Sequence, residues 1–255
     1  MIKISAVSYL NTAPFIFGIL KSGFLSPDEF VLTRENPAAC AASLLRNDAQ
    51  IGIVPVAIIP KLKNFSILQR TCIGANDYVD SVMLFSQVPL NAIKKITLDW
   101  QSRTSVNLCR ILADEYWGIS PEWLQGSGDI IKSIQGHTAA VVIGDRALDH
   151  FGNFPYQYDL AKEWHTFTGL PFTFACWVAA PEVPADFIQR FEKALLFGLE
   201  HIDEVIETEI PNYPAAYQVK KYLSNTISYT FDQQKKKGLE TFLQFLGKII
   251  QHTPA

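Results

Sequence analysis

Long apolar runs and export signals are largely missing from this 255-residue sequence. No run reaches the roughly 18 apolar residues that a membrane-spanning helix needs, so we expect no membrane segment. The partly apolar stretch that ends at Leu20 is interrupted by Asn11, Thr12 and Pro14, and no small-residue cleavage site follows it. A signal peptide needs an unbroken apolar region, so we expect none and we predict a cytoplasmic protein.

Metal-binding and disulfide patterns are also missing. The four cysteines, Cys40, Cys72, Cys109 and Cys176, lie far apart and include no C-x-x-C pair. The five histidines show no H-x-x-x-H spacing. We therefore expect reduced thiols, no disulfide framework and no metal site.

Strong charge of one sign is the third missing feature. The formal net charge is −3, and no basic stripe indicates a nucleic-acid partner. The one short basic run, Lys235–Lys237, fits the solvated face of a helix. Hydrophobic residues make up 48% of the chain, enough for one large α/β domain or two small ones. The sequence indicates no particular oligomeric state.

Strand and helix patterns alternate along the chain, which is typical of sheets with parallel strands. Asn36 can cap a helix that Pro37 begins, and the continuous apolar run at 51–59 predicts a strand buried on both faces. The other expected strands are 2–7, 31–33, 96–98, 139–143 and 173–180, and the other expected helices are 14–20, 106–117, 130–134, 187–206 and 239–250.

The order of these elements predicts a two-lobed α/β fold, with each lobe a mainly parallel sheet flanked by helices. We expect residues 1–85 and 181–255 in the first lobe and residues 86–180 in the second, with crossover segments at 82–86 and 173–180. Ligands of open α/β sheets bind beyond the carboxyl ends of the strands, so we expect a ligand cleft between the two lobes. The positions at those ends are 8–11, 55, 99–105 and 144–145.

Four segments, in the same order along the chain, resemble the signatures of the chorismate dehydratases of the futalosine route to menaquinone. The segments are Ser8–Phe15, Ser102–Val106, Gly144–Leu148 and Asp159–Phe172. The resemblance covers about residues 1–180, and the C-terminal helices match only in character. The turn at Leu10–Pro14 fits these dehydratases better than the sibling family that makes 1,4-dihydroxy-6-naphthoate.

This resemblance implies a fold similar to the type II periplasmic binding proteins. It also implies a hydro-lyase that converts chorismate to 3-[(1-carboxyvinyl)oxy]benzoate and water, the first step of the route, without a cofactor or metal. Asn11 and Ser81 match family positions that touch the substrate, and we predict them as the catalytic residues. The alternatives are the sibling naphthoate synthase and a non-catalytic cytosolic protein that binds small anions.

A dianionic substrate needs anion-binding groups, and the segment 102–105 offers them. Thr104 and Ser105 open a helix, where free N–H groups and the helix dipole favour an anion. Alternatively, Ser102 or Thr104 only caps that helix. Arg103 could form either a bidentate pair with a substrate carboxylate or a surface salt bridge.

The remaining candidates follow the other strands. Ser8 and Asn11 come directly after the first strand, and the Asn11 amide can both donate and accept. Asn11 could instead be an ordinary turn residue. Asp145 ends the strand at 139–143 and would either bind a substrate hydroxyl or cap the next helix. We therefore expect Ser8, Arg103, Thr104, Ser105 and Asp145 to bind the substrate.

Overall fold

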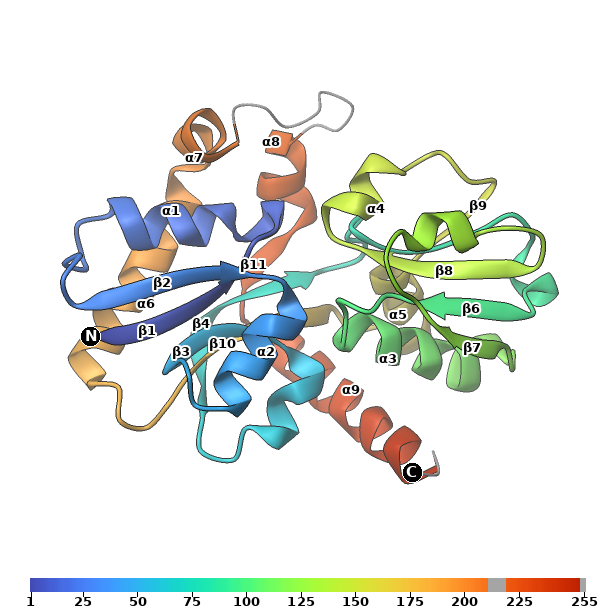
Figure 1. The fold of residues 1–255 in the computed structure, drawn as a ribbon, viewed down its shortest axis with the longest axis horizontal. Coiled ribbons are helices and arrows are strands. Elements are labelled where there is room, and N and C mark those ends of the chain that lie inside the picture. The colour runs from blue at the N-terminus through green and yellow to red at the C-terminus, as the bar shows by residue number, and fades with distance from the viewer. Residues whose placement is uncertain (211–218, 253–255) are drawn as a thin grey trace. The chain divides into compact units, whose positions relative to one another are not determined.

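Two β-sheets, each flanked by helices, organise the chain in the computed structural model, which describes residues 1–210 and 219–252 (Figure 1). The chain divides into two compact units. The first unit comprises Met1–Ile73 and Phe174–Asp232, and the second comprises Gly74–Thr173 and Gln233–Ala255.

The last helix lies in a different unit from the one that we expected. Helix α9 (Gln233–His252) is part of the second unit, although we expected all of 181–255 in the first lobe. There the Phe242 ring packs edge-on against Trp164 and Phe172, with ring centroids 6.4 and 5.2 Å away. An amphipathic pattern shows that a helix has a buried face, but it does not identify the surface that covers that face.

The crossover segments also differ from the expected ones. The segment at 82–86 is a strand of the second sheet, β5 (Val82–Ser86), and the chain leaves the first unit earlier, within β4 (Ser66–Ala75). Strand β10 (Phe172–Ala179) spans the second boundary, close to the predicted 173–180.

The first sheet has six strands in the order β11-β4-β10-β3-β1-β2. Strand β1 pairs in parallel with both β2 and β3, whereas β10 runs antiparallel to β3. The carboxyl ends of the three parallel strands therefore share one edge. The other strands of this sheet are β1 (Ile2–Val7), β2 (Phe30–Glu35), β3 (Ile51–Pro55) and β11 (Ser228–Thr230).

Helices α1 (Ala13–Lys21) and α2 (Pro37–Leu45) lie on opposite sides of this sheet (Figure 1). Asn36 caps α2 by accepting the Ala39 N–H at 2.9 Å, so the predicted helix start is confirmed. The other helices of the unit are α6 Ala185–Glu200, α7 Ile202–Glu209 and α8 Val219–Lys221, and its short 3₁₀ and π turns are 10–12, 56–61 and 222–226.

The apolar run at 51–59 was predicted as one strand, and this prediction is wrong for its second half. The strand ends at Pro55, and residues 56–61 form a 3₁₀ helix. Val54 of the strand and Ile58 of the helix belong to one buried cluster with Leu44 of α2. A run that is buried throughout has no periodicity that separates strand from helix.

The second sheet has five strands in the order β7-β6-β8-β5-β9. Strand β6 is parallel to β7 and β8, whereas β5 is antiparallel to β8 and β9. Both sheets are therefore mixed rather than mainly parallel, because β5 and β10 enter them in the opposite direction. The other strands of this sheet are β6 (Lys95–Leu98), β7 (Glu122–Gln125), β8 (Thr138–Ile143) and β9 (Tyr156–Asp159).

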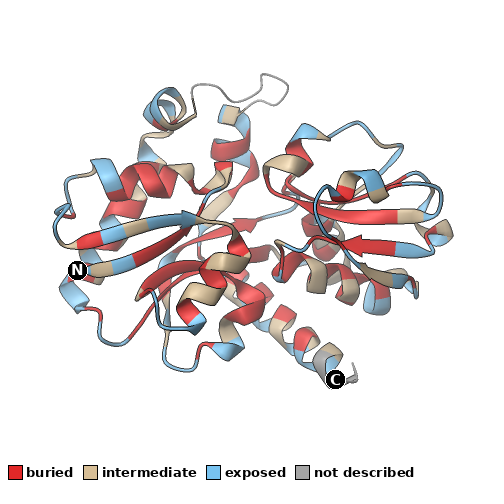
Figure 2. Ribbon diagram, viewed as in Figure 1, coloured by how far each residue is buried: buried red, intermediate tan, exposed pale blue. Residues whose placement is uncertain are grey.

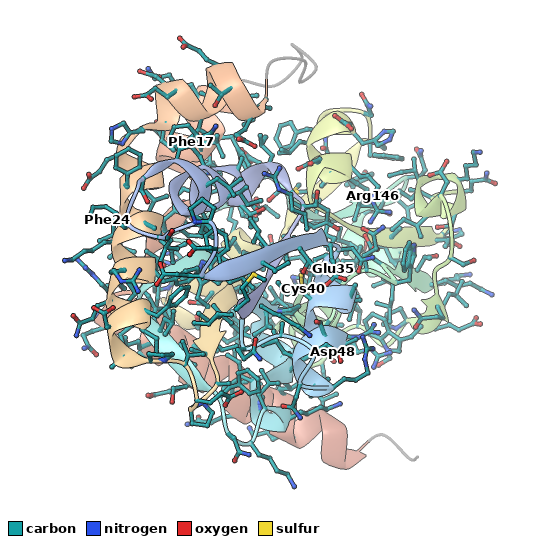
Figure 3. The ribbon with its side chains drawn as sticks, turned by 60° about the vertical axis from the view of Figure 1, so that its left-hand side comes forward. Phe17, Phe24, Glu35, Cys40, Asp48 and Arg146 are labelled. Atoms are coloured by element: carbon teal, nitrogen blue, oxygen red, sulfur yellow. The ribbon has the colours of Figure 1, made fainter. Side chains whose placement is uncertain are left out.

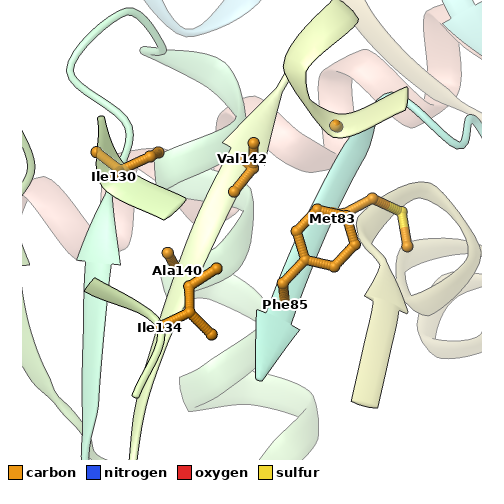
Figure 4. Close-up of a cluster of buried hydrophobic side chains, with 7 residues drawn as sticks. Met83, Phe85, Ile130, Ile134, Ala140 and Val142 are labelled. Carbon is orange, nitrogen blue, oxygen red and sulfur yellow. The ribbon is translucent and has the colours of Figure 1, made fainter. Parts of the chain in front are cut away.

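Each face of the second sheet is covered by its own helices. Alternate residues of β5 and β8 point to one face, where a buried cluster forms under the short helix at 130–133 and helix α4 (Asp145–Asp149) (Figure 4). Its members are Met83, Phe85, Ile130, Ile134, Ala140, Val142 and Ala147. The intervening residues of both strands are also buried (Figure 2), in agreement with helices on both sides.

The remaining helices of the second unit are α3 (Thr104–Leu112) and α5 (Leu160–Thr168). A π-helical turn at 113–117 extends α3 to Trp117, where the sequence predicted its end, and Gly118 follows in the left-handed conformation. None of the helices within 1–210 and 219–252 is both long and apolar enough to cross a membrane.

Candidate functional site

One edge of the second sheet gathers most of the residues predicted for the site. The carboxyl ends of the parallel strands β6 and β8 meet there, and the antiparallel strand β5 begins there, because Val82 pairs with Ile143. Ser81 precedes β5 and accepts the Gly144 N–H through its carbonyl oxygen at 2.8 Å. The expectation that 99–105 and 144–145 share an edge is confirmed, and Ser81 lies beside them.

An ion pair joins the two loops of this edge. Asp99 follows β6, and its buried carboxylate accepts from the Arg146 guanidinium at 2.6 Å and from the Ile143 N–H at 3.3 Å. The same Arg146 nitrogen also donates to Gln101 Oε1 at 3.2 Å. About a third of the Arg146 side chain is exposed. A guanidinium with one nitrogen held by a carboxylate keeps other N–H groups that can bind an anion.

The start of α3 is capped by Ser102. Its hydroxyl oxygen accepts the Ser105 N–H at 3.0 Å, which is the interaction of a capping serine. Of the two predicted capping residues, the structure therefore supports Ser102. Thr104 and Ser105 are buried residues in the first turn of this helix, where they were predicted to bind an anion.

Arg103 and Asp145 lie on the same edge with different exposures. Arg103 is exposed and forms no ion pair with the residues that the structure describes, which leaves its predicted surface salt bridge without support. Asp145 is half-buried and is the first residue of α4. Gly144 occupies the capping position of that helix, with φ +66° and ψ −149°, a conformation open essentially to glycine.

Ser81 is buried at the end of a tight turn. Its N–H donates to Val79 O at 2.7 Å, and Asp80 between them has φ +59°. The Asp159 carboxylate accepts the N–H groups of Val79 and Asp80 at 2.8 and 2.7 Å. Burial raises the pKa of Asp159 to about 6, against the lowering effect of these backbone donors.

The corresponding edge of the first sheet carries Ser8. Val7 of β1 and Glu35 of β2 pair at this edge, and the exposed Ser8 donates its N–H to Glu35 O at 2.8 Å. The Glu35 carboxylate accepts from the Ser5 hydroxyl at 3.0 Å, near Cys40 (Figure 3). Burial raises the pKa of the Cys40 thiol to about 11, so this cysteine stays protonated at neutral pH.

Asn11 follows in a short 3₁₀ turn that other residues hold in place. The buried Thr12 hydroxyl donates to the carbonyl oxygens of Val7 and Tyr9, at 2.5 and 2.7 Å. The Tyr229 hydroxyl donates to Asn11 O at 3.0 Å. The Asn11 side-chain nitrogen donates to the Tyr222 hydroxyl at 3.5 Å, and no other residue in the described part of the chain bonds to this amide.

Comparison with known proteins identifies the family. A family model described as menaquinone biosynthesis matches residues 2–248. The chain belongs to this family. It is 26% identical over 262 residues to the chorismate dehydratase of Thermus thermophilus, covering 94% of this chain and 93% of that protein. It is 28% identical over 111 residues to the chorismate dehydratase of Campylobacter jejuni, covering 41% and 47%.

The solved structures that resemble this member of the menaquinone biosynthesis family show its fold. Protein AF1704 from Archaeoglobus fulgidus matches with a TM-score of 0.79 at 12% identity, over 98% of both chains. A Candida albicans protein with the generic periplasmic-binding-protein fold matches with a TM-score of 0.68 at 15% identity, over 100% of this chain and 92% of that chain. The predicted periplasmic-binding-protein-like fold is therefore confirmed.

The edges of this family member offer hydrogen-bond donors and positive charge rather than a nucleophile. The second unit contributes Arg103, Arg146 and the first turn of α3, which together suit carboxylates. The first unit contributes the Asn11 amide and the Ser8 hydroxyl. No cluster of three or more His, Cys, Asp or Glu side chains that could hold a metal occurs among the described residues.

Sequence reasoning missed four residues that shape these edges, Arg146, Asp159, Tyr222 and Tyr229, and it placed Asp99 at a strand end without giving it a role. Arg146 and Asp159 lie inside the recognised segments, but the pairing of Arg146 with Asp99 requires the strand order. Tyr222 and Tyr229 lie more than 200 positions from Asn11, and no local pattern connects them.

Proposed function

We propose that this protein dehydrates chorismate to 3-[(1-carboxyvinyl)oxy]benzoate in menaquinone biosynthesis. The observation that carries this proposal is the family match over residues 2–248, together with the full-length similarity to the Thermus thermophilus chorismate dehydratase. The reaction is a carbon–oxygen lyase step, and we propose that it needs no cofactor or metal.

The two carboxylates of chorismate require positive charge and N–H donors. We propose that Arg146, Arg103 and the helix start at Thr104 and Ser105 bind one of these carboxylates. The buried Asp99 holds Arg146 in one orientation, so the guanidinium loses little freedom when an anion binds. Asp145 and Ser8 supply further polar groups. We assign Asp145 to accept from the substrate hydroxyl and Ser8 to donate to the second carboxylate.

The chemical step removes the proton at C3 and the hydroxyl at C4. The electron pair of the C3–H bond forms the new ring double bond as the C4–O bond breaks, and the proton and the hydroxide together make one water. Asn11 and Ser81 are too weakly basic to take the proton at neutral pH. We propose that the enolpyruvyl carboxylate of the substrate takes it, while Asn11 and Ser81 orient the ring and donate to the departing hydroxyl.

A direct assay tests this proposal. Purified protein is incubated with chorismate in the presence of a chelator and without nucleotides, and the products are separated by chromatography and followed by ultraviolet absorption. We expect chorismate to disappear and the enolpyruvyl benzoate to form in equal amount. Unchanged chorismate at high protein concentration would overturn the proposal, and binding without turnover would indicate a small-anion binder. Turnover only of the substrate of the sibling naphthoate synthase would assign the protein to that reaction.

A further inference from the structure

The turn that leads into Ser81 has an unfavourable backbone conformation. Asp80 has φ +59°, in the left-handed region that residues with a Cβ atom seldom adopt. The hydrogen bond from Ser81 N–H to Val79 O closes a three-residue turn around it, at 2.7 Å. Turns of this size with positive φ at the centre are rare and strained. Such a turn persists only where its surroundings hold it.

Asp159 is the side chain that holds this turn. Its Oδ2 accepts the N–H groups of Val79 and Asp80 at 2.8 and 2.7 Å. Its Oδ1 accepts the N–H groups of Ala161 and Lys162 at 2.9 and 3.2 Å, which caps α5. One carboxylate thus anchors the turn to the start of a helix. One carboxylate oxygen of Asp159 is enough to cap the helix, so the other oxygen accepts hydrogen bonds from the turn only.

The turn fixes Ser81 at the edge that carries the other candidate residues. From Ser81 the chain enters β5, where Val82 pairs with Ile143. The Ser81 carbonyl accepts the Gly144 N–H, immediately before Asp145. A change in the backbone at Asp80 would therefore rotate Ser81 relative to Asp145 while leaving the rest of β5 in register.

We propose that Asp159 is a positioning residue that holds Val79–Ser81 in its strained turn and thereby orients Ser81 toward the substrate. This inference rests on the proposed function, because it assumes that Ser81 acts in chorismate dehydration. The proposed positioning role differs from helix capping. If Asp159 only capped α5, turnover would be unchanged when another capping residue replaces it.

Two substitutions of Asp159 separate its capping of α5 from its proposed role in holding the turn. In Asp159→Ser, the hydroxyl can still cap α5 but is too short to reach the turn. In Asp159→Asn, the amide can keep one accepting oxygen, and its nitrogen cannot accept from the turn. We expect both variants to lose roughly 10- to 100-fold in kcat on chorismate, with KM within about threefold of the wild type, as for a misplaced catalytic group. The matched control is Asp129→Asn, which removes a capping carboxylate from the helix at 130–133 and should leave kcat unchanged.

A second substitution in the turn tests the strain directly. Glycine adopts positive φ readily, so Asp80→Gly should restore kcat in the Asp159→Asn background by at least about threefold. Asp80→Ala removes the same charge but keeps a Cβ atom, and it should restore nothing. If the wild type turns over chorismate and Asp159→Ser keeps its kcat, the positioning role is overturned while the proposed function stands. If the wild type shows no turnover, the proposed function itself fails.

Discussion

The Arg146 guanidinium and the Asp99 carboxylate are 2.6 Å apart and join the loop after β6 to the helix after β8. Asp99 is fully buried, whereas Arg146 keeps about a third of its side chain exposed. The pair therefore has one structural role and one proposed role at this edge of the second unit. It compensates a buried negative charge, and we propose that the exposed part of its guanidinium binds an anion.

Substitution of the two partners should separate these functions. Arg146→Gln removes the positive charge, and we expect it to weaken chorismate binding by about 1.5–3 kcal/mol, the usual contribution of a hydrogen bond to a charged group. It should also lower the free energy of unfolding, because it leaves the buried Asp99 carboxylate unpaired. Asp99→Asn keeps the cation, so we expect it to lower the free energy of unfolding with a smaller effect on chorismate binding. Kinetics and urea unfolding measure the two effects. Arg46→Gln, which breaks an exposed pair with Asp48, is the control and should change neither. An unchanged KM in Arg146→Gln would show that this residue is only structural.

At the start of α3, different substitutions should change either the stability of the fold or the binding of substrate. Ser102→Ala removes the cap and should lower the free energy of unfolding by about 1 kcal/mol. Thr104→Ala and Ser105→Ala should each weaken substrate binding by about 1–3 kcal/mol if their hydroxyls donate to a carboxylate. Thermal melts and KM values for the three variants provide the comparison. A lower melting temperature with an unchanged KM in all three would support a capping role for the whole segment.

Much of this arrangement could be predicted because local rules govern it. Asn36 and Pro37 mark a helix start on their own, and the strand-to-loop transitions at Ser8, Asp99 and Gly144 follow from apolar runs that end in polar residues. The direction of β5 could not be predicted, because a buried apolar strand has the same pattern whichever way it enters a sheet. Hydrogen-bond partners that lie far apart in the sequence, such as Tyr222 and Asn11, are brought together only by the tertiary fold.

The contact between α1 and α6 should depend on two glycines. A Cβ atom at Gly198 would lie 1.7 Å from Pro14 O, and one at Gly18 would lie 1.9 Å from Ala194 O. Gly198→Ala must push the helices apart, and we expect a loss of roughly 1–3 kcal/mol or more in the free energy of unfolding. Gly247→Ala in α9 is the matched control, because nothing lies within 4 Å of the added atom. Calorimetry should show a lower melting temperature for the first variant only.

The ion pair between Glu29 and Arg190 predicts a pH dependence of stability in the first unit. Arg190 donates to both Glu29 oxygens at 2.8 Å and lowers the pKa of Glu29 from 4.5 to about 2. A lowered carboxyl pKa stabilises the fold above the unfolded pKa, and this contribution is lost as the pH falls toward the folded pKa. The stability difference between wild type and Glu29→Gln should therefore be constant above about pH 5.5, decline between about pH 4.5 and pH 2, and be small at pH 2. Urea unfolding across this range measures the difference, and a difference at pH 2 as large as the one at neutral pH would contradict the assignment.

Substitution of Asn11 tests whether the first unit takes part in the proposed dehydration of chorismate. Its side chain makes one long hydrogen bond, to the Tyr222 hydroxyl at 3.5 Å, so Asn11→Ala should melt near the wild-type temperature. We expect it to lose on the order of 10²-fold in kcat, the typical effect of removing one transition-state donor. Asn11→Asp should be at least as damaging, because it places a negative charge beside a dianionic substrate.

Tyr222→Phe completes the Asn11 series. It removes the hydroxyl that accepts from the Asn11 amide and leaves the amide itself in place. If Tyr222 only orients the Asn11 amide, this variant should lose less activity than Asn11→Ala. Asn153→Asp, at an exposed loop position, is the control for adding one negative charge, and its activity should match the wild type. Near-normal turnover in Asn11→Asp would show that the Asn11 side chain faces away from the substrate, because no carboxylate in contact with a dianion could leave its dehydration unaffected.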